Sequence, residues 1–313
     1  MNTLGEALQE YLELRRGLGF KMDSAGLLLP RFVRFMEEHG AAYITARLAL
    51  QWAQQAPSVQ PAEWARRLGF VRGFARFRSA TDVRTEIPPL GLLPHHSTRA
   101  RPYLYTEQEV QCLLEATLRL PTAWPSTPLR PWVFHCLLGL LSVTGLRIAE
   151  ALNLTLGDID LERAILTIRG AKLGRVRLVP LHPSTCAVLA DYLQRRARFF
   201  KQPVSPYVFV SRCGTQLDRG RVRRTFYALS RETGLRAVGA HQGPRLHDFR
   251  HRFAVQVLLR WYQSGEDAGR LLPLLSTYLG HVCVADTYWY LSAWPELMTQ
   301  AMARLERRWG ESS

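Results

Sequence analysis

Apolar residues recur at helical spacing through the first quarter of the chain. They repeat every three or four positions, which is the period of a helix with one buried face. The segments with this period are 4–12, 28–36, 46–52 and 64–77. The following stretch, 87–97, lacks any period and is rich in proline and glycine, as is typical of a linker. The pattern predicts a helical domain over residues 1–86 and a linker over 87–102.

The pattern of apolar and polar residues over 103–313 predicts a second domain that is mostly helical with one hairpin. Thr106 is followed three residues later by Glu109, which resembles a capping box at a helix start. Strand-like patterns at 164–168 and 176–179 flank a glycine-containing turn and predict a β-hairpin. Helical patterns cover 131–143, 147–152, 183–200, 219–233, 248–263, 271–279, 286–290 and 295–309. The expected fold class is mainly α with a small antiparallel β-hairpin or sheet.

Positive charge is concentrated in one part of the chain. The 313 residues carry a net charge of +15 at pH 7. Residues 163–252 hold 19 Lys and Arg against 4 Asp and Glu, whereas the remaining residues hold 22 of each. Because guanidinium groups match phosphate oxygens, this excess favours a phosphate-binding surface and a polyanionic partner over a solvated basic face. A membrane surface would require an amphipathic or lipid anchor, and the sequence shows none.

Cysteine spacing and hydropathy argue against a disulfide-rich, a zinc-binding and a membrane-spanning protein. The five cysteines are scattered without any Cys-x-x-Cys pair, so neither a disulfide framework nor a zinc site is indicated. The longest apolar stretch, 132–143, is shorter than the about 20 residues of a membrane span. The first six residues lack the features of a signal peptide. These observations predict a soluble, cytoplasmic (nucleoid-associated) protein without a membrane partner.

Four separated segments carry the polar residues with candidate chemistry. Taken alone, each segment has a structural explanation. Arg147 could form an ion pair with Glu150, and the lysine could be a solvated loop residue. The histidine and arginine that lie three apart could be a structural helix face, and the tyrosine could be an aromatic core residue. The candidates are Arg147, Lys172, His247, Arg250, His281 and Tyr290.

Taken together, these six side chains fit an attack on a phosphodiester without a metal ion. Arginine and histidine donate hydrogen bonds to oxygens on which charge develops, and a phenol can form a covalent intermediate. Holding an unperturbed tyrosine ionised at pH 7 costs about 4 kcal/mol, so a neighbouring base such as His247 and a cationic pocket are required. Lys172 on a turn can deliver a proton to the departing oxygen. Because the sequence has no Asp/Glu cluster or His-Glu-x-x-His motif, a metal-dependent nuclease is set aside.

The order and spacing of the four segments resemble the tyrosine recombinase, or phage-integrase-like, family. Its first arginine box is matched by Thr-Gly-Leu-Arg at 144–147 with Glu150, and its hairpin by Lys172 seven residues before Val-Pro-Leu. The His-x-x-Arg box is matched at 247–250, and Leu-Gly-His at 279–281 precedes Tyr290 by the family spacing. The resemblance covers nearly the whole chain. It implies a two-domain, C-shaped clamp with a SAM-like core-binding domain at 1–86 and a catalytic domain at 103–313.

The resemblance also implies a role for each candidate. Arg147, Arg250 and His281 would clamp the scissile phosphate, and His247 would share the tyrosine proton. Lys172 would be the general acid, and Tyr290 would attack to give a 3′-phosphotyrosyl link. Strand exchange would then pass through a four-way junction without ATP, divalent metal or cofactor. Tyr288 competes with Tyr290, but the two side chains point about 200° apart on a helix, and Tyr290 has the family spacing.

The resemblance implies a double-stranded recombination site as the DNA partner, with a homo-tetramer assembled on it and a monomer free in solution. Arginines in the basic segment would mostly contact phosphates, which position DNA without specifying its sequence. These are Arg175, Arg177, Arg219, Arg221, Arg223, Arg224 and Arg245. The last helix, 295–309, either closes the core of its own chain or docks on a neighbouring protomer, and docking is slightly preferred.

Three functions remain to be separated. The first is site-specific integration, excision or transposition by a mobile-element recombinase, because the 288–297 segment resembles transposon-encoded members. The second is relaxation of DNA by a type IB topoisomerase, which uses the same nucleophile chemistry. The third is a DNA-binding regulator without catalytic activity, which the six candidate side chains disfavour.

Overall fold

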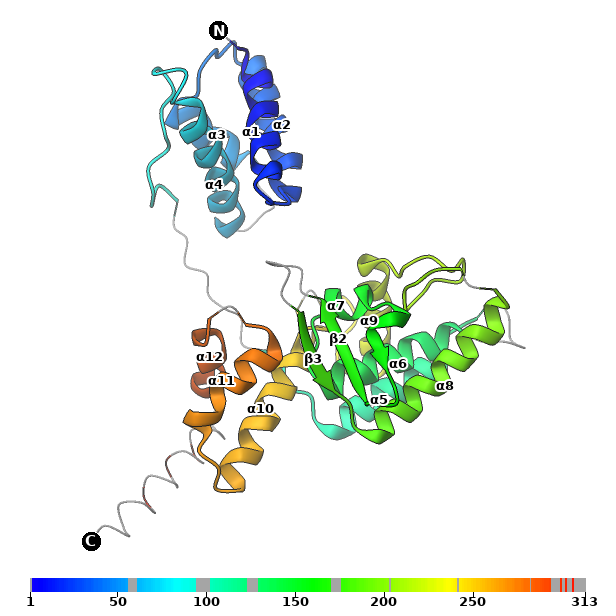
Figure 1. Ribbon diagram of the computed structural model, residues 1–313. Helices are drawn as coiled ribbons and strands as arrows, with labels where there is room; N and C mark the ends of the chain where they lie inside the picture. Colours follow the sequence, from blue (N-terminus) through cyan, green and yellow to red (C-terminus); the bar gives the residue numbers. More distant parts are fainter. Residues whose placement is uncertain are drawn as a thin grey trace. The chain divides into compact units, whose positions relative to one another are not determined.

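The computed structural model divides the chain into two compact units, Met1–Ala100 and Arg101–Ser313 (Figure 1). It describes residues 2–55, 61–93, 102–122, 129–169, 176–202, 204–240, 242–281 and 283–293, together with 299, 302 and 306. The division falls within the stretch that the sequence predicts as a linker. The fold is mostly helical with a small three-stranded antiparallel sheet, as expected.

The first unit is built from four helices whose apolar faces pack together. They are α1 (Leu4–Gly17), α2 (Asp23–Glu38), α3 (Ala46–Gln54) and α4 (Pro61–Arg78). Helix α1 begins with a capping box in which the Thr3 side chain accepts from the Glu6 amide and the Glu6 carboxylate accepts from the Thr3 amide. Phe32, Trp52 and Phe74 are among the fully buried side chains of this core. All four helices lie where the apolar period predicts them.

The second unit combines helices with a three-stranded antiparallel sheet. Its elements are α5 (Glu107–Leu118), α6 (Arg130–Thr144), α7 (Ile148–Asn153), the 3₁₀ turn η1 (Leu156–Asp158), β1 (Ile159–Asp160), β2 (Ile165–Arg169), β3 (Val176–Pro180), α8 (Pro183–Phe200), α9 (Arg219–Glu232), α10 (Asp248–Gln263), α11 (Ala268–Leu279) and α12 (Ala285–Ala293). The strands run in the order β1-β2-β3, and Leu166 of β2 lies opposite Val179 of β3.

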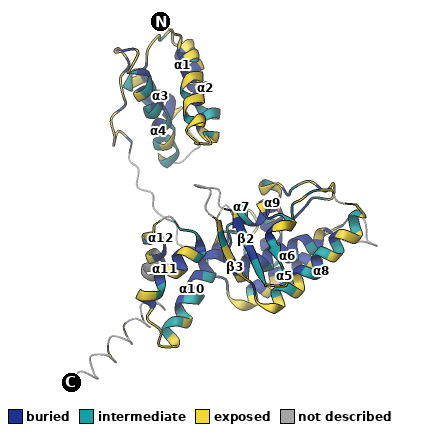
Figure 2. Ribbon diagram, in the orientation of Figure 1, coloured by how far each residue is buried: buried dark blue, intermediate teal, exposed yellow. Residues whose placement is uncertain are grey.

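Helix α6 forms the centre of this unit. It is apolar on nearly all sides, and it packs against α5, α8 and α10 (Figure 2). A helix without a polar face is stable only when it is covered on every side, which explains its central place. The capping box of Thr106 and Glu109 is present at the start of α5, as the sequence predicts.

Helices α10, α11 and α12 share a smaller apolar cluster beside the main core. Leu258 of α10, Leu272 and Leu275 of α11, and Tyr290 of α12 belong to it. This cluster brings the last two candidate segments of the sequence next to each other. The hairpin turn at 170–175 and nearly all of the predicted last helix lie outside the described residues. Within the part of the chain that the structure describes, no helix is long and apolar enough to cross a membrane.

Candidate active site

Arg147 lies between α6 and α7 and reaches the end of α11. Helix α6 ends at Gly145, which adopts a left-handed conformation with φ of 62°, and Arg147 is the extended residue just before α7. Its Nη1 donates to the Glu150 Oε1 at 2.9 Å, and its Nη2 donates to the Gly280 carbonyl at 3.0 Å. The first and last motifs of the sequence therefore meet through this side chain.

Arg250 is the most deeply buried charge of the site. It is 1% exposed on α10, and it donates to the Gly145 carbonyl at 3.0 Å and to the Leu279 carbonyl at 2.6 Å. Burial, with the nearby positive charge of Arg147, lowers the pKa of Arg250 to about 10, whereas Tyr290 and Glu150 act in the opposite direction. The guanidinium therefore stays charged at neutral pH and forms a fixed cation beside the phenol.

Glu150 joins the two sides of the cluster. Its Oε2 accepts from the Arg147 amide at 2.9 Å and from Arg177 Nη2 at 2.8 Å. Burial by itself would raise the pKa of Glu150, but hydrogen bonds and charge from Arg177 and Arg147 outweigh it and hold the pKa below its usual range. Glu150 is thus a shared anion within a group of arginines.

The position of Arg177 corrects a prediction from the sequence. As a residue on a basic hairpin it was expected to contact DNA phosphates. Its Nη1 and Nη2 instead hold Glu150 at 3.1 and 2.8 Å, and its Nε donates to the Tyr278 carbonyl at 2.7 Å. The side chain is only 14% exposed. A guanidinium in this ion pair faces the protein, so Arg177 is not the surface charge that the sequence analysis took it to be.

Tyr290 lies inside the unit beside His281. Its ring stacks on that of His281 with centroids 6.3 Å apart, and the residue is 2% exposed. A hydrogen bond of 2.7 Å joins His281 Nδ1 to the buried hydroxyl of Thr287, which fixes the imidazole. Tyr288, the competing tyrosine, is 52% exposed. Of the two tyrosines, Tyr290 is therefore the one that approaches the arginine cluster.

His247 reaches this group through a second histidine. His247 lies just before α10, and its ring meets that of His251 edge-to-face at 4.7 Å. The buried His251 ring in turn lies 5.5 Å from the Tyr290 ring. Five of the six predicted catalytic residues thus gather in one place; Lys172 lies outside the described residues.

The remaining predicted DNA contacts fall into three groups. Arg219, Arg221, Arg223 and Arg224 are exposed at the start of α9. Arg245 is half exposed, and its Nη2 pairs with the buried Asp248 at 2.9 Å. Arg175 lies outside the described residues.

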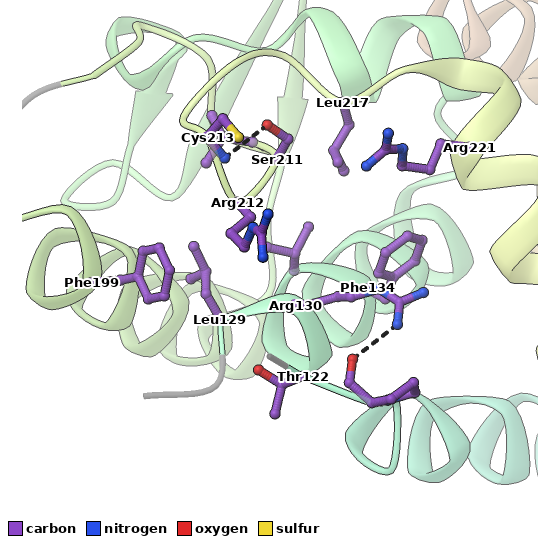
Figure 3. Close-up of a pocket in the computed structure, with 13 residues that line it drawn as sticks. Thr122, Leu129, Arg130, Phe134, Phe199, Ser211, Arg212, Cys213, Leu217 and Arg221 are labelled. Atoms are coloured by element: carbon purple, nitrogen blue, oxygen red, sulfur yellow. Dashed lines mark hydrogen bonds between the residues drawn. The ribbon is translucent and has the colours of Figure 1, made fainter. Parts of the chain in front are cut away.

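A cavity of about 450 Å³ lies among α6, α8 and the start of α9 (Figure 3). Arg130, Arg212 and Arg221 line it together with apolar side chains such as Phe134 and Phe199. None of the five candidate catalytic residues that the structure describes is among its lining residues. Over the described residues, the structure shows no group of three or more His, Cys, Asp and Glu side chains that could hold a metal ion.

Sequence reasoning did not predict His251, the inward-facing position of Arg177, or Thr287. His251 follows His247 by four positions, so the two share one helix face. Arg177 precedes the buried Val179 by two positions, and in a strand both side chains point to the same face. Thr287 precedes Tyr290 by one helical turn but has no distinguishing motif. The periodicity of helix and strand could therefore have found the first two.

The arrangement suits an anionic substrate that reacts with the phenol. Two arginines and a histidine lie next to Tyr290, and they can donate to oxygens that gain charge during a reaction. The pair of His247 and His251 also lies near the ring, and an imidazole can take up a proton. The site thus combines a nucleophile, a base and a set of cationic donors.

Comparison with known proteins gives consistent matches. Residues 105–295 match the phage integrase family. The chain is 56% identical over 310 residues, 99% of both chains, to the y4rB protein of Sinorhizobium fredii, whose name describes it as an integrase/recombinase. It is 32% identical over 238 residues to the tyrosine recombinase XerD of Caulobacter vibrioides, covering 75% of this chain and 72% of XerD.

Solved structures share the fold. The XerH recombinase bound to its difH substrate after cleavage superposes with a TM-score of 0.67 at 17% identity, over 97% of this chain and 85% of XerH. The Tn1549 transposon integrase bound to transposon end DNA gives 0.63 at 16% identity, over 98% and 99% of the two chains. A λ integrase tetramer on a Holliday junction gives 0.56 at 16% identity, over 90% and 78%.

Proposed function

Since the chain belongs to the phage integrase family of tyrosine recombinases and is a site-specific DNA recombinase, we propose that Tyr290 is its nucleophile and that Arg147, Arg250 and His281 hold the scissile phosphate. The observation that supports this assignment is the position of Tyr290. It stacks on His281 within the same cluster as the buried Arg250, whereas Tyr288 is half exposed. No other tyrosine of α12 approaches the arginines in the described structure.

The reaction proceeds in two balanced steps. The Tyr290 oxygen forms a bond to phosphorus, and the bond from phosphorus to the 5′ oxygen breaks. His247, whose ring contacts His251 beside Tyr290, accepts the phenol proton, and Lys172 gives a proton to the departing 5′ oxygen. A 5′ hydroxyl from the partner duplex then attacks the 3′-phosphotyrosyl link, forms the new bond to phosphorus and releases Tyr290. Lys172 takes up the hydroxyl proton, and His247 returns a proton to the phenol oxygen. Because one ester replaces another, no ATP and no divalent metal enter the balance.

The partner in this proposal is a double-stranded recombination site. The supporting observations are the exposed arginines at the start of α9 and the DNA-bound state of the structural relatives. Exchange between two duplexes requires four strand cuts, so four protomers act together on the DNA, as in the λ integrase tetramer on its junction. We propose that residues 295–309, which the sequence predicts as a helix, dock on a neighbouring protomer in this assembly.

Covalent trapping tests the nucleophile. DNA attached to the protein in cells is isolated and sequenced, which identifies the target site. That site is then placed in a nicked substrate from which the cleaved strand end diffuses away, so the covalent complex accumulates. We expect Tyr290→Phe to abolish the complex and the matched Tyr288→Phe to retain it. A covalent complex with Tyr290→Phe, or its loss only in Tyr288→Phe, would reverse the assignment.

A supercoiled plasmid without the site separates the recombinase from a topoisomerase. A topoisomerase relaxes such DNA irrespective of sequence, whereas a site-specific recombinase leaves it supercoiled. We expect no relaxation at protein concentrations that give full trapping on the identified site.

A further inference from the structure

Three consecutive carbonyls at the end of α11 are occupied by three arginines. Backbone bonds from Gly280 to Thr277 and from His281 to Ser276 close the helix, which leaves the carbonyls of 278, 279 and 280 without helical partners. Arg177 donates to the first, Arg250 to the second, and Arg147 to the second and third. The negative end of a helix dipole favours such cations. Arg177 therefore binds the same helix end as Arg147 and Arg250, the two arginines proposed to hold the phosphate.

Glu150 is shared unequally between its two arginines. Arg177 approaches it with both Nη atoms, in the two-pronged geometry that guanidinium and carboxylate prefer, whereas Arg147 offers one side-chain N–H. The side chain of Arg147 is 38% exposed against 14% for Arg177. Arg177 thus provides most of the neutralisation of Glu150 from inside. Arg147 keeps its Nε hydrogen and one Nη2 hydrogen for a ligand.

Gly280 makes the approach of Arg177 possible. This residue has φ of 67°, and a Cβ added to it would lie 2.8 Å from Arg177 Nη1 and 3.1 Å from Arg177 Cζ. Both distances are shorter than ordinary contacts, so any other residue would displace the guanidinium. The glycine before His281 is therefore matched to an arginine on β3, the strand that contacts α11.

We infer that Arg177 is a positioning residue for strand cleavage, which keeps Arg147 available to the scissile phosphate by neutralising Glu150 from the opposite side. This inference rests on the proposed function. Without Arg177, the carboxylate of Glu150 has Arg147 as its one remaining guanidinium partner in the cluster. Arg147 then closes on Glu150 with both prongs and loses the N–H groups that would otherwise hold the phosphate.

The test compares a single and a double variant on the nicked substrate. The quantity measured is the single-turnover rate of covalent trapping at saturating DNA. We expect Arg177→Met to lower this rate at least tenfold and to change DNA affinity less than twofold. The double variant Arg177→Met with Glu150→Gln removes the competing carboxylate charge. We expect it to trap DNA several-fold faster than Arg177→Met alone, because Arg147 is released.

Arg169→Met is the matched control. Arg169 lies on β2 and also pairs with a buried carboxylate, Asp158, at 2.8 Å, but it does not touch the cluster. We expect a wild-type trapping rate from it. Arg177→Lys is used if Arg177→Met does not fold, as judged by its melting curve. Lysine keeps the charge but cannot hold both Glu150 oxygens as the guanidinium does, so Arg147 is still partly drawn to Glu150. We again expect the double variant with Glu150→Gln to be the faster.

Two outcomes would overturn the inference: an unchanged rate in Arg177→Met, or a double variant no faster than the single one, as expected of a purely structural role. Absence of trapping by the wild-type protein would instead contradict the proposed function, so the two failures are distinguishable.

Discussion

At the scale of single residues, Gly145 determines where Arg147 can be. It ends α6 in a left-handed conformation, and a Cβ added to it would lie 2.7 Å from Cδ1 of Phe253 on α10. The glycine thus permits both the sharp turn before Arg147 and the close packing of that turn on the next candidate segment. Its carbonyl also accepts from Arg250, so a shift of the turn would move both arginines.

Gly145→Ala is expected to lower the free energy of unfolding by about 2–4 kcal/mol, from the strain of a left-handed alanine and the overlap with Phe253. Chemical denaturation measures this change. Gly157→Ala is the control, because a Cβ there meets nothing within 4 Å, and we expect it to change stability by less than about 1 kcal/mol. Equal losses in the two variants would contradict the packing argument.

At this scale, motifs of fixed spacing predicted which side chains lie together. Arg147, His247, Arg250, His281 and Tyr290 were found because their intervals along the chain match a known set. Arg177 was misassigned because its charge was read as surface charge, although its place two residues before Val179 puts it on the inner face of β3. Its partner Glu150 lies 27 residues away, and a pairing over that distance has no sequence signal.

At the scale of elements, Glu150 ties three of them together. It lies on α7, it pairs with Arg177 of β3, and through Arg147 it is connected to the end of α11. The carboxylate has a folded-state pKa below its unfolded value. Its stabilisation is therefore fully present above the unfolded pKa, about 4.5, and is lost as the pH falls through the lower folded pKa.

Glu150→Gln is expected to lower the free energy of unfolding at pH 7 by about 3 kcal/mol, because it leaves the largely buried Arg177 and the more exposed Arg147 without their anion. The difference from wild type should shrink as the pH falls from about 5 toward 3, where the wild-type carboxyl is also neutral. Denaturation curves at several pH values measure it. A difference that stays constant over this range would show that the carboxylate charge is not responsible.

Helices were predicted well because most are long enough to show their period. Helices α8 and α10 begin and end where the apolar pattern places them. Strand β1 was not predicted as a strand because its two residues cannot display alternation. It exists through pairing with β2, which is a tertiary effect.

At the scale of the whole molecule, the excess positive charge lies in one segment, but the arginines of that segment differ in exposure. The excess of +15 lies within 163–252, a part of the second unit. Of its arginines, Arg177 and Arg250 are used inside the protein, whereas those at the start of α9 are exposed. Net charge therefore predicted the kind of partner but could not tell an internal arginine from a surface one.

Replacing Arg219, Arg223 and Arg224 with Gln is expected to weaken DNA binding about equally for all sequences. The slope of log K against log salt should fall in magnitude by about 0.9 for each phosphate contact that is lost. Binding titrations at several salt concentrations measure both. The control is Arg119→Gln, because Arg119 is an exposed arginine paired with Glu232 outside the basic segment, and its slope should stay that of the wild type. An unchanged slope in the triple variant would remove α9 from the DNA-binding surface.

The burial of Tyr290 limits the access of its hydroxyl to DNA. A hydroxyl on a side chain that is 2% exposed cannot meet a passing phosphate by collision. If Tyr290 is the nucleophile proposed above, α12 or its neighbours must rearrange on DNA binding to uncover its hydroxyl. In this proposal the structure is a resting state, in which the nucleophile is protected from DNA that lacks the recombination site.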